Sequence, residues 1–375
     1  MMSGFNLSDH RRLVVKVGSS LLIGDDGEVR RGWLEGLAEN IATLREHSHE
    51  VLVVSSGSIA IGSTRLGINK KRARLEELQA AAAAGQVQLV HAWQESLAQH
   101  RIAAAQVLLT PGDTENRRRF LNARGTLEKL LDHGVVPIIN ENDTVATDEI
   151  RYGDNDRLAA RVAQLVMADA LILLSDVDGL YTSDPGSDAG AEHIAEVRKI
   201  TDEIQAMAGE TQSDIGSGGM ATKVQAARIA THAGCSTVIA SGVIERPLEA
   251  LAAGGTCTVF RAEGSPAAAR KQWLAGVLEV RGELRLDDGA VVALNDGKSL
   301  LPVGVVEVTG NFRRGDVVNL VNNHGTELGR GLAEYSSEEA TSLAGCQSEQ
   351  IEARLGYRGR SVMVHRDDLV MFDHD

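Results

Sequence analysis

Two lysines stand at positions where lysine is unusual in a globular protein. Lys16 lies within the apolar run 13–17, and Lys223 follows the glycine-rich run 216–219 at the start of a predicted helix. A lysine at a sheet edge can simply extend its charge into water, and a glycine loop can lead to an ordinary surface lysine. However, a cation near the N-terminus of a helix opposes the helix dipole, at a typical cost of about 0.3–1 kcal/mol. Such a local misfit often marks function, so we expect both lysines to meet the phosphates of a nucleotide.

Polar and glycine-rich residues follow several short apolar runs. They occupy positions 18–20, 55–58, 140–143, 175–176 and 241–242. Ligands of an open parallel sheet bind beyond the carboxyl ends of its strands. Glycine lets backbone N–H groups approach phosphate oxygens, and the N-terminus of a following helix adds a partial positive charge. One Gly-Ser turn is more often only a turn, but several at one edge favour a phosphate-binding site.

The run Gly-Asp-Asn-Asp at 153–156 begins another helical pattern. Asn and Asp cap helix N-termini, yet capping accounts for one of the three polar residues and not for all of them. Asp143 is near in the sequence and follows the apolar run 135–139. We therefore predict that this cluster binds the α-ammonium group of an amino acid and positions the two lysines. Capping alone is the alternative interpretation.

Several other kinds of site are not supported. The sequence has no GxxxxGK[ST] loop and no HRD and DFG pair, which excludes the P-loop and protein-kinase classes. The histidines are scattered, and the three cysteines, Cys235, Cys257 and Cys346, form no CxxC pair, so we expect no protein metal site. The arginine run 117–119 is typical of a solvated helix face.

Charge and hydropathy narrow the class of protein further. The formal net charge of −14 argues against a general nucleic-acid-binding protein, since phosphate-backbone binding needs a surplus of Lys and Arg. No apolar run approaches the roughly 20 residues of a membrane span, and residues 1–12 are too polar for a signal peptide. Few and widely separated cysteines suit a reducing compartment. We expect a cytoplasmic protein that does not bind a membrane.

Continuous apolar runs predict the strands that position these residues. The runs do not alternate with polar residues, which is typical of a parallel sheet covered by helices on both faces. They lie at 13–17, 51–54, 104–109, 135–139, 170–174 and 237–240. Helical periodicity at 33–47, 75–100 and 120–133 repeats the order strand, helix, strand. We predict a three-layer α/β/α sandwich with a mainly parallel sheet.

A change of composition at 262–269 predicts a second domain. The 375-residue chain exceeds the roughly 250–300 residues of a single core. Beyond it, short β-like pieces such as 303–308 and 317–321 are separated by Asp-Gly and Gly-Asp turns. The predicted organisation is an α/β catalytic domain at 1–262, a linker at 263–275 and a small β-rich domain at 276–375.

The motifs, taken in order, resemble the glutamate 5-kinase family of the amino acid kinase superfamily. The matching stretches are VVKVGSSLL at 14–22, VSSGSIAIG at 54–62, RRRFLNARGTLEKLL at 117–131, VPIINENDTV at 136–145, YGDNDRLAARVA at 152–163, LLSDVDGLYTSDP at 173–185 and GSGGMATKVQAA at 216–227. Residues 276–365 resemble a PUA domain in layout and in pieces such as VGVVEVTGNFRRGDVV at 303–318. The resemblance implies the amino acid kinase fold, with eight mainly parallel strands, followed by a PUA-like domain.

The resemblance also implies roles for individual positions. Lys16 and Lys223 match two lysines that neutralise charge on the transferring phosphoryl group, and Asp156 matches the aspartate that orients both. The glutamate-binding positions correspond to Ser56, Asp143 and Asn155. The nucleotide-binding positions correspond to Lys16, Ser175, Asp176, Ser217, Gly218, Gly219, Met220, Ala221, Thr222 and Lys223. Position 175 is commonly Thr in the family and position 221 is frequently Ser or Thr, so this chain departs from the pattern at two nucleotide contacts.

The implied reaction is ATP-dependent phosphorylation of the γ-carboxylate of L-glutamate, the first step of proline biosynthesis. Mg²⁺ is expected to bridge the phosphates, with no protein ligand assigned. Feedback inhibition by L-proline and a homo-oligomer, dimer or tetramer, are implied as well.

Two alternatives to this reaction remain open. The nearest is another carboxylate kinase of the superfamily, acting on acetylglutamate or aspartate. An RNA-binding PUA protein is a further alternative, although residues 276–375 hold 10 Lys and Arg against 17 Asp and Glu, a net charge of −7.

Overall fold

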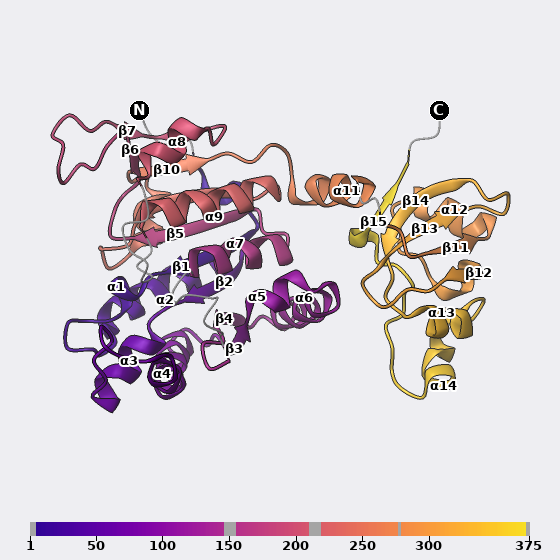
Figure 1. Ribbon diagram of the computed structural model, residues 1–375, viewed down its shortest axis with the longest axis horizontal. Coiled ribbons are helices and arrows are strands. Elements are labelled where there is room, and N and C mark those ends of the chain that lie inside the picture. The colour runs from indigo at the N-terminus through magenta and orange to yellow at the C-terminus, as the bar shows by residue number, and fades with distance from the viewer. Residues whose placement is uncertain (1–4, 146–154, 210–218, 277–278, 373–375) are drawn as a thin grey trace. The chain divides into compact units, whose positions relative to one another are not determined.

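The computed structural model describes residues 5–145, 155–209, 219–276 and 279–372. The chain divides into two compact units (Figure 1). The first comprises Met1–Glu115 and Asn122–Pro266, and the second comprises Asn116–Leu121 and Ala267–Asp375. None of the helices in the described ranges combines the length and the apolar character that a membrane span needs.

The first unit is built on an eight-stranded sheet. Its strand order is β3-β4-β2-β1-β5-β9-β10-β8, and every neighbouring pair is parallel except β9 and β10. This confirms the predicted mainly parallel sheet. The strands are β1 (Arg12–Val17), β2 (Glu50–Ser55), β3 (Ala104–Leu109), β4 (Val136–Glu141), β5 (Ala170–Ser175), β8 (Glu196–Val197), β9 (Ser236–Ser241) and β10 (Cys257–Phe260). A separate antiparallel pair joins β6 (Leu180–Tyr181) to β7 (His193–Ile194).

The helices of this unit cover both faces of the sheet. Their bounds are α1 (Ser19–Leu22), α2 (Arg31–Glu46), α3 (Ser58–Leu66), α4 (Leu75–Ala98), α5 (Pro111–Glu115), α6 (Arg117–Asp132), α7 (Asn155–Leu165), α8 (Asp202–Met207), α9 (Met220–His232) and α10 (Pro247–Ala252). Residues 117–121 of α6 belong to the second unit. A 3-10 helix spans Leu7–Asp9. The predicted strands and helices therefore exist with boundaries that differ by at most three residues, because strand and helix ends depend on contacts that periodicity does not report.

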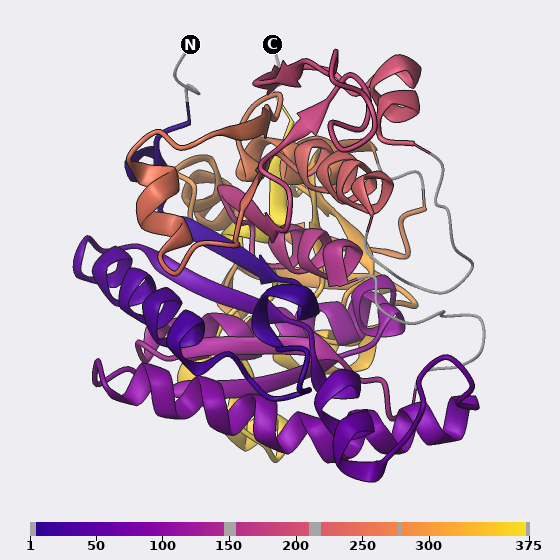
Figure 2. The same cartoon turned by 90° about the vertical axis from the view of Figure 1, so that its left-hand side faces the viewer.

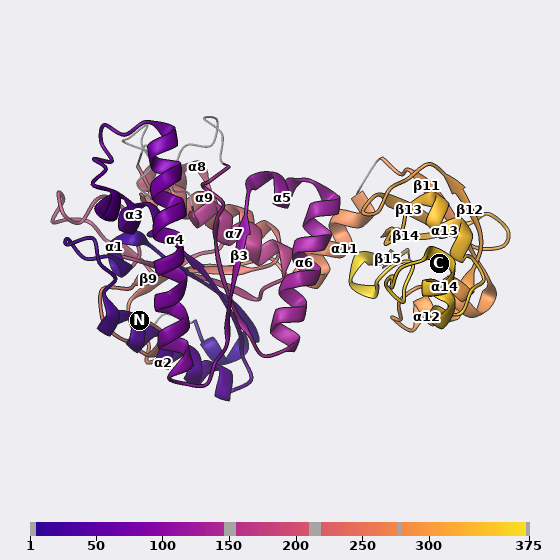
Figure 3. The same cartoon turned by 90° about the horizontal axis from the view of Figure 1, so that it is seen from below.

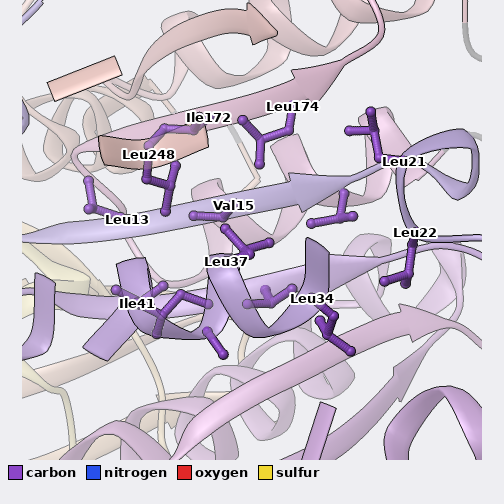
Figure 4. Close-up of a cluster of buried hydrophobic side chains, with 14 of the residues drawn as sticks. Leu13, Val15, Leu21, Leu22, Leu34, Leu37, Ile41, Ile172, Leu174 and Leu248 are labelled. Atoms are coloured by element: carbon purple, nitrogen blue, oxygen red, sulfur yellow. The ribbon is translucent and has the colours of Figure 1, made fainter. Parts of the chain in front are cut away.

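One face of the sheet packs on α2 and α4. Figure 4 shows Leu13 and Val15 of β1 and Ile172 of β5 beside Leu37 and Ile41 of α2, all fully buried. These strands are buried on both faces, since five of the six residues of β1 and all six of β5 are buried. The continuous apolar runs in the sequence follow from this double burial.

The opposite face packs on α7 and α9. Side chains alternate along a strand, so Val14 and Lys16 face away from Leu13 and Val15. Helix α7 contacts β1 and β5, and α9 contacts β9 and α7. Figure 2 shows the sheet between its helix layers, and Figure 3 shows the long α4 lying beside α3. Lys16 is thereby directed toward the layer that contains α7.

The second unit holds a five-stranded sheet of order β12-β11-β13-β14-β15 with its own core. The strands are β11 (Gly282–Leu286), β12 (Val305–Gly310), β13 (Val317–Val321), β14 (Glu327–Leu332) and β15 (Leu369–Met371). Its helices are α11 (Pro266–Gly276), α12 (Asp288–Asn295), α13 (Ser337–Leu343) and α14 (Ile351–Leu355), with 3-10 helices at Pro302–Gly304, Ser348–Gln350 and Arg366–Asp368. The stretch 263–275, expected to be a linker, contains most of α11.

The arginine run 117–119 is not uniformly solvated. Arg118 and Arg119 are exposed, but the guanidinium of Arg117 lies 5.8 Å from the centre of the Trp273 ring. Arg270 lies over the same ring at 4.9 Å. Charge clustering in the sequence reports solvent exposure only on average, and here an aromatic ring attracts one member of the run.

Candidate active site

The ammonium groups of Lys16 and Lys223 share the carboxylate of Asp156 near the carboxyl ends of the parallel strands. Lys16 lies in β1, Asp156 in the first turn of α7, and Lys223 near the start of α9. The Nζ atom of Lys16 lies 2.7 Å from Oδ1 of Asp156, and the Nζ atom of Lys223 lies 3.3 Å from Oδ2. Three segments far apart in the sequence therefore meet at one side chain, which can hold both cations in a fixed relation.

Burial strengthens the electrostatic interactions among these three charges. The exposed fractions are 6% for Lys16, 1% for Asp156 and 4% for Lys223. Burial raises the pKa of Asp156, but the charges of the two lysines and hydrogen bonding lower it by more, to about 2. The carboxylate is therefore ionised at neutral pH. Because its folded pKa is depressed, its stabilising contribution is present above its ordinary pKa of 3.8 and is lost as the pH falls through about 2.

Thr222 completes the surroundings of this carboxylate. Its Oγ1 donates to Oδ2 of Asp156 at 2.9 Å and also lies 2.8 Å from the carbonyl oxygen of Gly219. The cation at the start of α9 thus has an anion beside it, which offsets its unfavourable interaction with the helix dipole. The carboxylate that offsets the unfavourable position of Lys223 is that of Asp156 in α7, 67 residues away in the chain.

A second polar cluster lies at the ends of β2 and β4. Asn155 donates from Nδ2 to Oγ of Ser56 at 2.6 Å and to Oδ1 of Asn140 at 3.1 Å. The Oδ1 atom of Asn155 is buried and has no hydrogen-bond partner in the described structure. Asn155 is only 5% exposed, so this atom is a buried acceptor, and buried acceptors are normally hydrogen-bonded.

Asp143 belongs to the same polar cluster. Burial raises its pKa to about 6, and a hydrogen bond from Ser58 only partly opposes this rise. Ser58 in turn accepts from Nδ2 of Asn140 at 3.2 Å. A buried carboxylate without a cation beside it among the described residues favours binding of a cationic group.

Gly57 allows Ser56 and Ser58 to reach this cluster together. Its φ of +117° lies in a region that L side chains rarely adopt, and a Cβ there would come within 3.0 Å of Ile23. The chain turns at this glycine from β2 into α3, which leaves Ser56 at the strand end and Ser58 at the helix start. The glycine in the sequence motif therefore has a conformational reason.

The structure describes all of the predicted nucleotide-binding residues except two. Ser175 ends β5, is buried, and donates from Oγ to Oδ1 of the exposed Asp176 at 2.9 Å. Gly219 precedes α9, and Met220 and Ala221 form its first turn with Thr222. Ser217 and Gly218 lie outside the described residues.

A cavity of about 370 Å³ lies beside the start of α9. Its walls include Ala221, Val224 and Gln225 of α9 and Ile200 and Gln205 near α8. This space adjoins the helix that carries Lys223, but neither Lys223 nor Lys16 lines it.

The described residues do not offer a resident metal site. Among them, no three His, Cys, Asp or Glu side chains gather closely enough to hold an ion. Both oxygens of Asp156 are already occupied by lysine and threonine. The two lysines beside Asp156 suit an anionic ligand.

Sequence reasoning missed three side chains that join the predicted substrate residues. Asn140 and Ser58 lie within polar runs already singled out, but neither was distinguished from its neighbours. Gln86 lies in α4, far from any motif, and its Oε1 accepts from Asn140 at 2.8 Å. The available signal was a glutamine within an alanine-rich helical stretch, which periodicity alone does not make notable.

Comparisons with known proteins identify the family of this chain. The model of the amino acid kinase family matches residues 11–241, and that of the PUA domain matches residues 276–355. A glutamate 5-kinase from Paramagnetospirillum magneticum is 56% identical over 366 residues, covering 97% of this chain and 99% of that protein. One from Rhizobium rhizogenes is 54% identical, covering 98% and 94%. Among solved structures, carbamate kinase from Giardia lamblia bound to AMP-PNP matches with a TM-score of 0.48 at 16% identity, over 68% of this chain and 100% of that one. The chain therefore belongs to the glutamate 5-kinases of the amino acid kinase family, with a PUA domain after the kinase domain.

Proposed function

We propose that this protein transfers the terminal phosphate of ATP to the γ-carboxylate of L-glutamate, forming L-glutamyl 5-phosphate, the first step of proline biosynthesis. The observation that carries the proposal is the pairing of Lys16 and Lys223 through Asp156. The preceding residue, Asn155, makes a different set of contacts, with Ser56 and Asn140. Adjacent residues of α7 thereby join a phosphate-binding charge cluster to an amino-acid-binding cluster.

The reaction needs positioning and charge more than proton transfer. The γ-carboxylate of glutamate has an ordinary pKa of about 4.3 and is ionised near neutral pH, so no general base is required. A carboxylate oxygen attacks the γ-phosphorus in line, and the bond from phosphorus to the ADP oxygen breaks. Lys16 and Lys223 stabilise the charge on the transferring group, and Asp156 keeps both in place.

Asp143 and Asn155 suit the α-ammonium group of a free amino acid. The carboxylate of Asp143 supplies a negative charge, and the unpartnered Oδ1 of Asn155 supplies an acceptor. An N-acetylated amino acid carries no such charge, which favours glutamate over acetylglutamate. Aspartate is shorter by one methylene and would place its carboxylate farther from the lysines.

The nucleotide is proposed to lie along the start of α9. Ser175, Asp176 and residues 217–223 would contact it, with the cavity beside Ala221 and Val224 holding part of it. Mg²⁺ is proposed to arrive with ATP, because phosphoryl transfer commonly uses a metal that bridges the phosphates. Since the described side chains form no carboxylate cage, we assign the ion to the substrate complex.

The experiment that tests this function measures ADP release with Mg-ATP and traps the acyl phosphate with hydroxylamine. Glutamate, N-acetylglutamate, aspartate and no amino acid are run in parallel. Release of ADP and formation of the hydroxamate with glutamate alone are expected. If only another acid gives a signal, that acid is the substrate and glutamate is not. If no acid gives a signal, the proposed reaction is refuted.

The pH dependence of glutamate binding is expected to follow the titration of the Asp143 carboxyl group. Its pKa of about 6 means that it becomes protonated as the pH falls below that value, so it loses its attraction for the ammonium group. The KM for glutamate should rise about tenfold per pH unit below about 6, while the KM for ATP changes little. The measurement is a pH profile of kcat/KM for glutamate.

The variant Asp143→Asn is the control for that pH profile. It should raise the KM for glutamate at pH 7.5 and remove the inflection near pH 6. Because the folded pKa lies above the ordinary 3.8, this group lowers stability as the pH rises from about 4 to 6. The variant should therefore be at least as stable as the wild type at pH 7.5, and an unchanged inflection would show that another group titrates.

Thr222 is expected to act through Asp156. Thr222→Val removes one hydrogen bond to the carboxylate and should lower kcat about tenfold, whereas Thr222→Ser keeps the hydroxyl and should stay near the wild type. Steady-state kinetics of the two variants make the comparison. Equal losses in both variants would show that the hydrogen bond is not the cause, because Thr222→Ser keeps it.

Other features of the protein are proposed from its family. We expect inhibition by L-proline at or near the glutamate site, a dimer or tetramer, a cytoplasmic location and functional domains at 1–262 and 276–375. The acidic C-terminal domain, with a net charge of −7 over 276–375, favours a regulatory or oligomer-supporting role. Salt-sensitive RNA binding by the full chain would overturn that last assignment.

A further inference from the structure

The side-chain amide of Asn140 uses its full hydrogen-bonding capacity. Its Nδ2 donates to Oγ of Ser58 at 3.2 Å and to Oε1 of Gln86 at 2.8 Å. Its Oδ1 accepts from the backbone N of Glu141 at 2.9 Å and from Nδ2 of Asn155 at 3.1 Å. Asn140 is 1% exposed, so water does not replace any of these partners.

This amide connects to all three proposed glutamate-binding side chains. It contacts Asn155 directly and reaches Ser56 through Asn155. It reaches Asp143 through Ser58, because an Oγ that accepts from Asn140 has its own hydrogen free for the carboxylate. The orientation of one buried amide therefore affects the whole amino-acid cluster.

Gln86 supports this orientation from outside the cluster, together with the backbone N of Glu141, which can only donate. If the Asn140 amide turned over, its Oδ1 would face Oε1 of Gln86, and its Nδ2 would face two donors, the N of Glu141 and Nδ2 of Asn155. The backbone N of Glu141 fixes Oδ1 of Asn140 on its own side, and Gln86 supplies the acceptor that Nδ2 of Asn140 then needs. Asn155 must then present Nδ2 to Asn140, which leaves its Oδ1 free to accept from an ammonium group.

Close packing of two helices brings Gln86 to this place. A Cβ at Gly85 would lie 1.9 Å from the carbonyl oxygen of Ser58, and one at Gly62 would lie 1.8 Å from that of Ala81. Only glycine permits such an approach of α3 and α4. The residue next to Gly85 is thereby held against the start of α3 and the end of β4.

Stability alone does not account for Gln86. The side chain is 9% exposed, and its Nε2 has no hydrogen-bond partner in the described structure. A buried donor without a partner is costly, so an apolar side chain of similar size would serve packing better. Residues that break a local rule in this way are often kept for function.

We propose that Gln86 is a positioning residue for the amino-acid substrate. By fixing the amide of Asn140, it holds Asn155, Ser56 and the Ser58–Asp143 pair in the arrangement that binds the ammonium end of glutamate. It makes no contact with the reacting phosphoryl group. This inference rests on the proposed function, because it names what sets the affinity of that same site.

The first test is the variant Gln86→Met in the full-length chain. Methionine fills a similar volume and offers no comparable acceptor to Asn140. The KM for glutamate is expected to rise about tenfold, with kcat and the KM for ATP nearly unchanged and the thermal midpoint not lowered. Gln88→Met, on the same helix at a partly exposed position, is the matched control and should behave as the wild type. Gln86→Leu carries the same expectation should the methionine variant fold poorly.

The second test is a double-mutant cycle with Asn140→Ala. If Gln86 acts through Asn140, adding Gln86→Met to Asn140→Ala should cause no further rise in the KM for glutamate. An unchanged KM in folded Gln86→Met, or a full additional tenfold rise in the double variant, would overturn the inference. Wild-type enzyme without glutamate-dependent activity would instead refute the proposed function, and the two failures are distinguished by that one measurement.

Discussion

Replacing Asp156 with asparagine is expected to lower kcat by about a thousandfold and to destabilise the protein. Asparagine keeps the shape of the side chain but removes the charge that holds both Lys16 and Lys223. Preorganised charge is commonly worth about 10²–10³ in turnover. Removing one partner of a buried ion pair typically costs about 3–5 kcal/mol, because the remaining charge stays buried. Steady-state kinetics and denaturant unfolding measure the two effects.

Two further variants separate the causes. Asp132→Asn removes an exposed carboxylate that pairs with Lys129 and should change neither quantity by much. Asp156→Glu keeps the charge but moves it by one methylene, so it should retain more stability than Asp156→Asn while turnover stays low. Wild-type turnover in a folded Asp156→Asn protein would be incompatible with the proposed orienting role.

Replacing Lys223 with alanine is expected to lower kcat by at least about a hundredfold, as follows from the loss of one preorganised charge donor. The fold should persist, because Asp156 keeps its ion pair with Lys16 and its hydrogen bond from Thr222. The KM for glutamate should change little, since Ser56, Asp143 and Asn155 are untouched. Turnover and KM from the hydroxamate assay make the measurement.

Lys129→Ala is the matched control for this variant. That lysine is 76% exposed and forms an ion pair with the surface residue Asp132. Its removal should leave kcat unchanged. Near-normal turnover of a folded Lys223→Ala protein would defeat the assignment of Lys223 to the phosphoryl group.

The two halves of the site are expected to respond differently to mutation. Variants of Lys223, Asp156 and Thr222 act on charge at the phosphoryl group and should appear mainly in kcat. Variants of Asp143 and Gln86 act on the ammonium end of the substrate and should appear mainly in the KM for glutamate. Asn155 is next to Asp156 at the start of α7, so this one turn of helix carries a contact to each half.

Much of the fold was predictable because burial on both faces of the sheet leaves continuous apolar runs. The strand Ala104–Leu109 was predicted with its observed bounds, and β1 differed by one residue. The cations were also predictable, since Lys16 interrupts an apolar strand and Lys223 follows a glycine run. Local misfits of this kind are visible without any structure.

The amide network was not predictable, because it depends on distances between segments far apart in the chain. Asn140 and Gln86 are 54 residues apart and meet only because glycines let α3 and α4 pack closely. The pKa values also required the structure. Asp143 and Asp156 are both aspartates followed by polar or charged residues, yet burial raises one pKa to about 6 and two lysines lower the other to about 2.

The sequence by itself determined the class of fold, the edge of the sheet at which we expect ligands to bind and the identity of the charged residues. Those properties follow from local periodicity and from residue type, which need no long-range information. Only the tertiary structure decided that Asp156 bridges two lysines, that Asn140 joins the proposed substrate residues and that Gln86 accepts a hydrogen bond from Asn140. These are relations between atoms of distant segments, and packing of the helices on the sheet sets them.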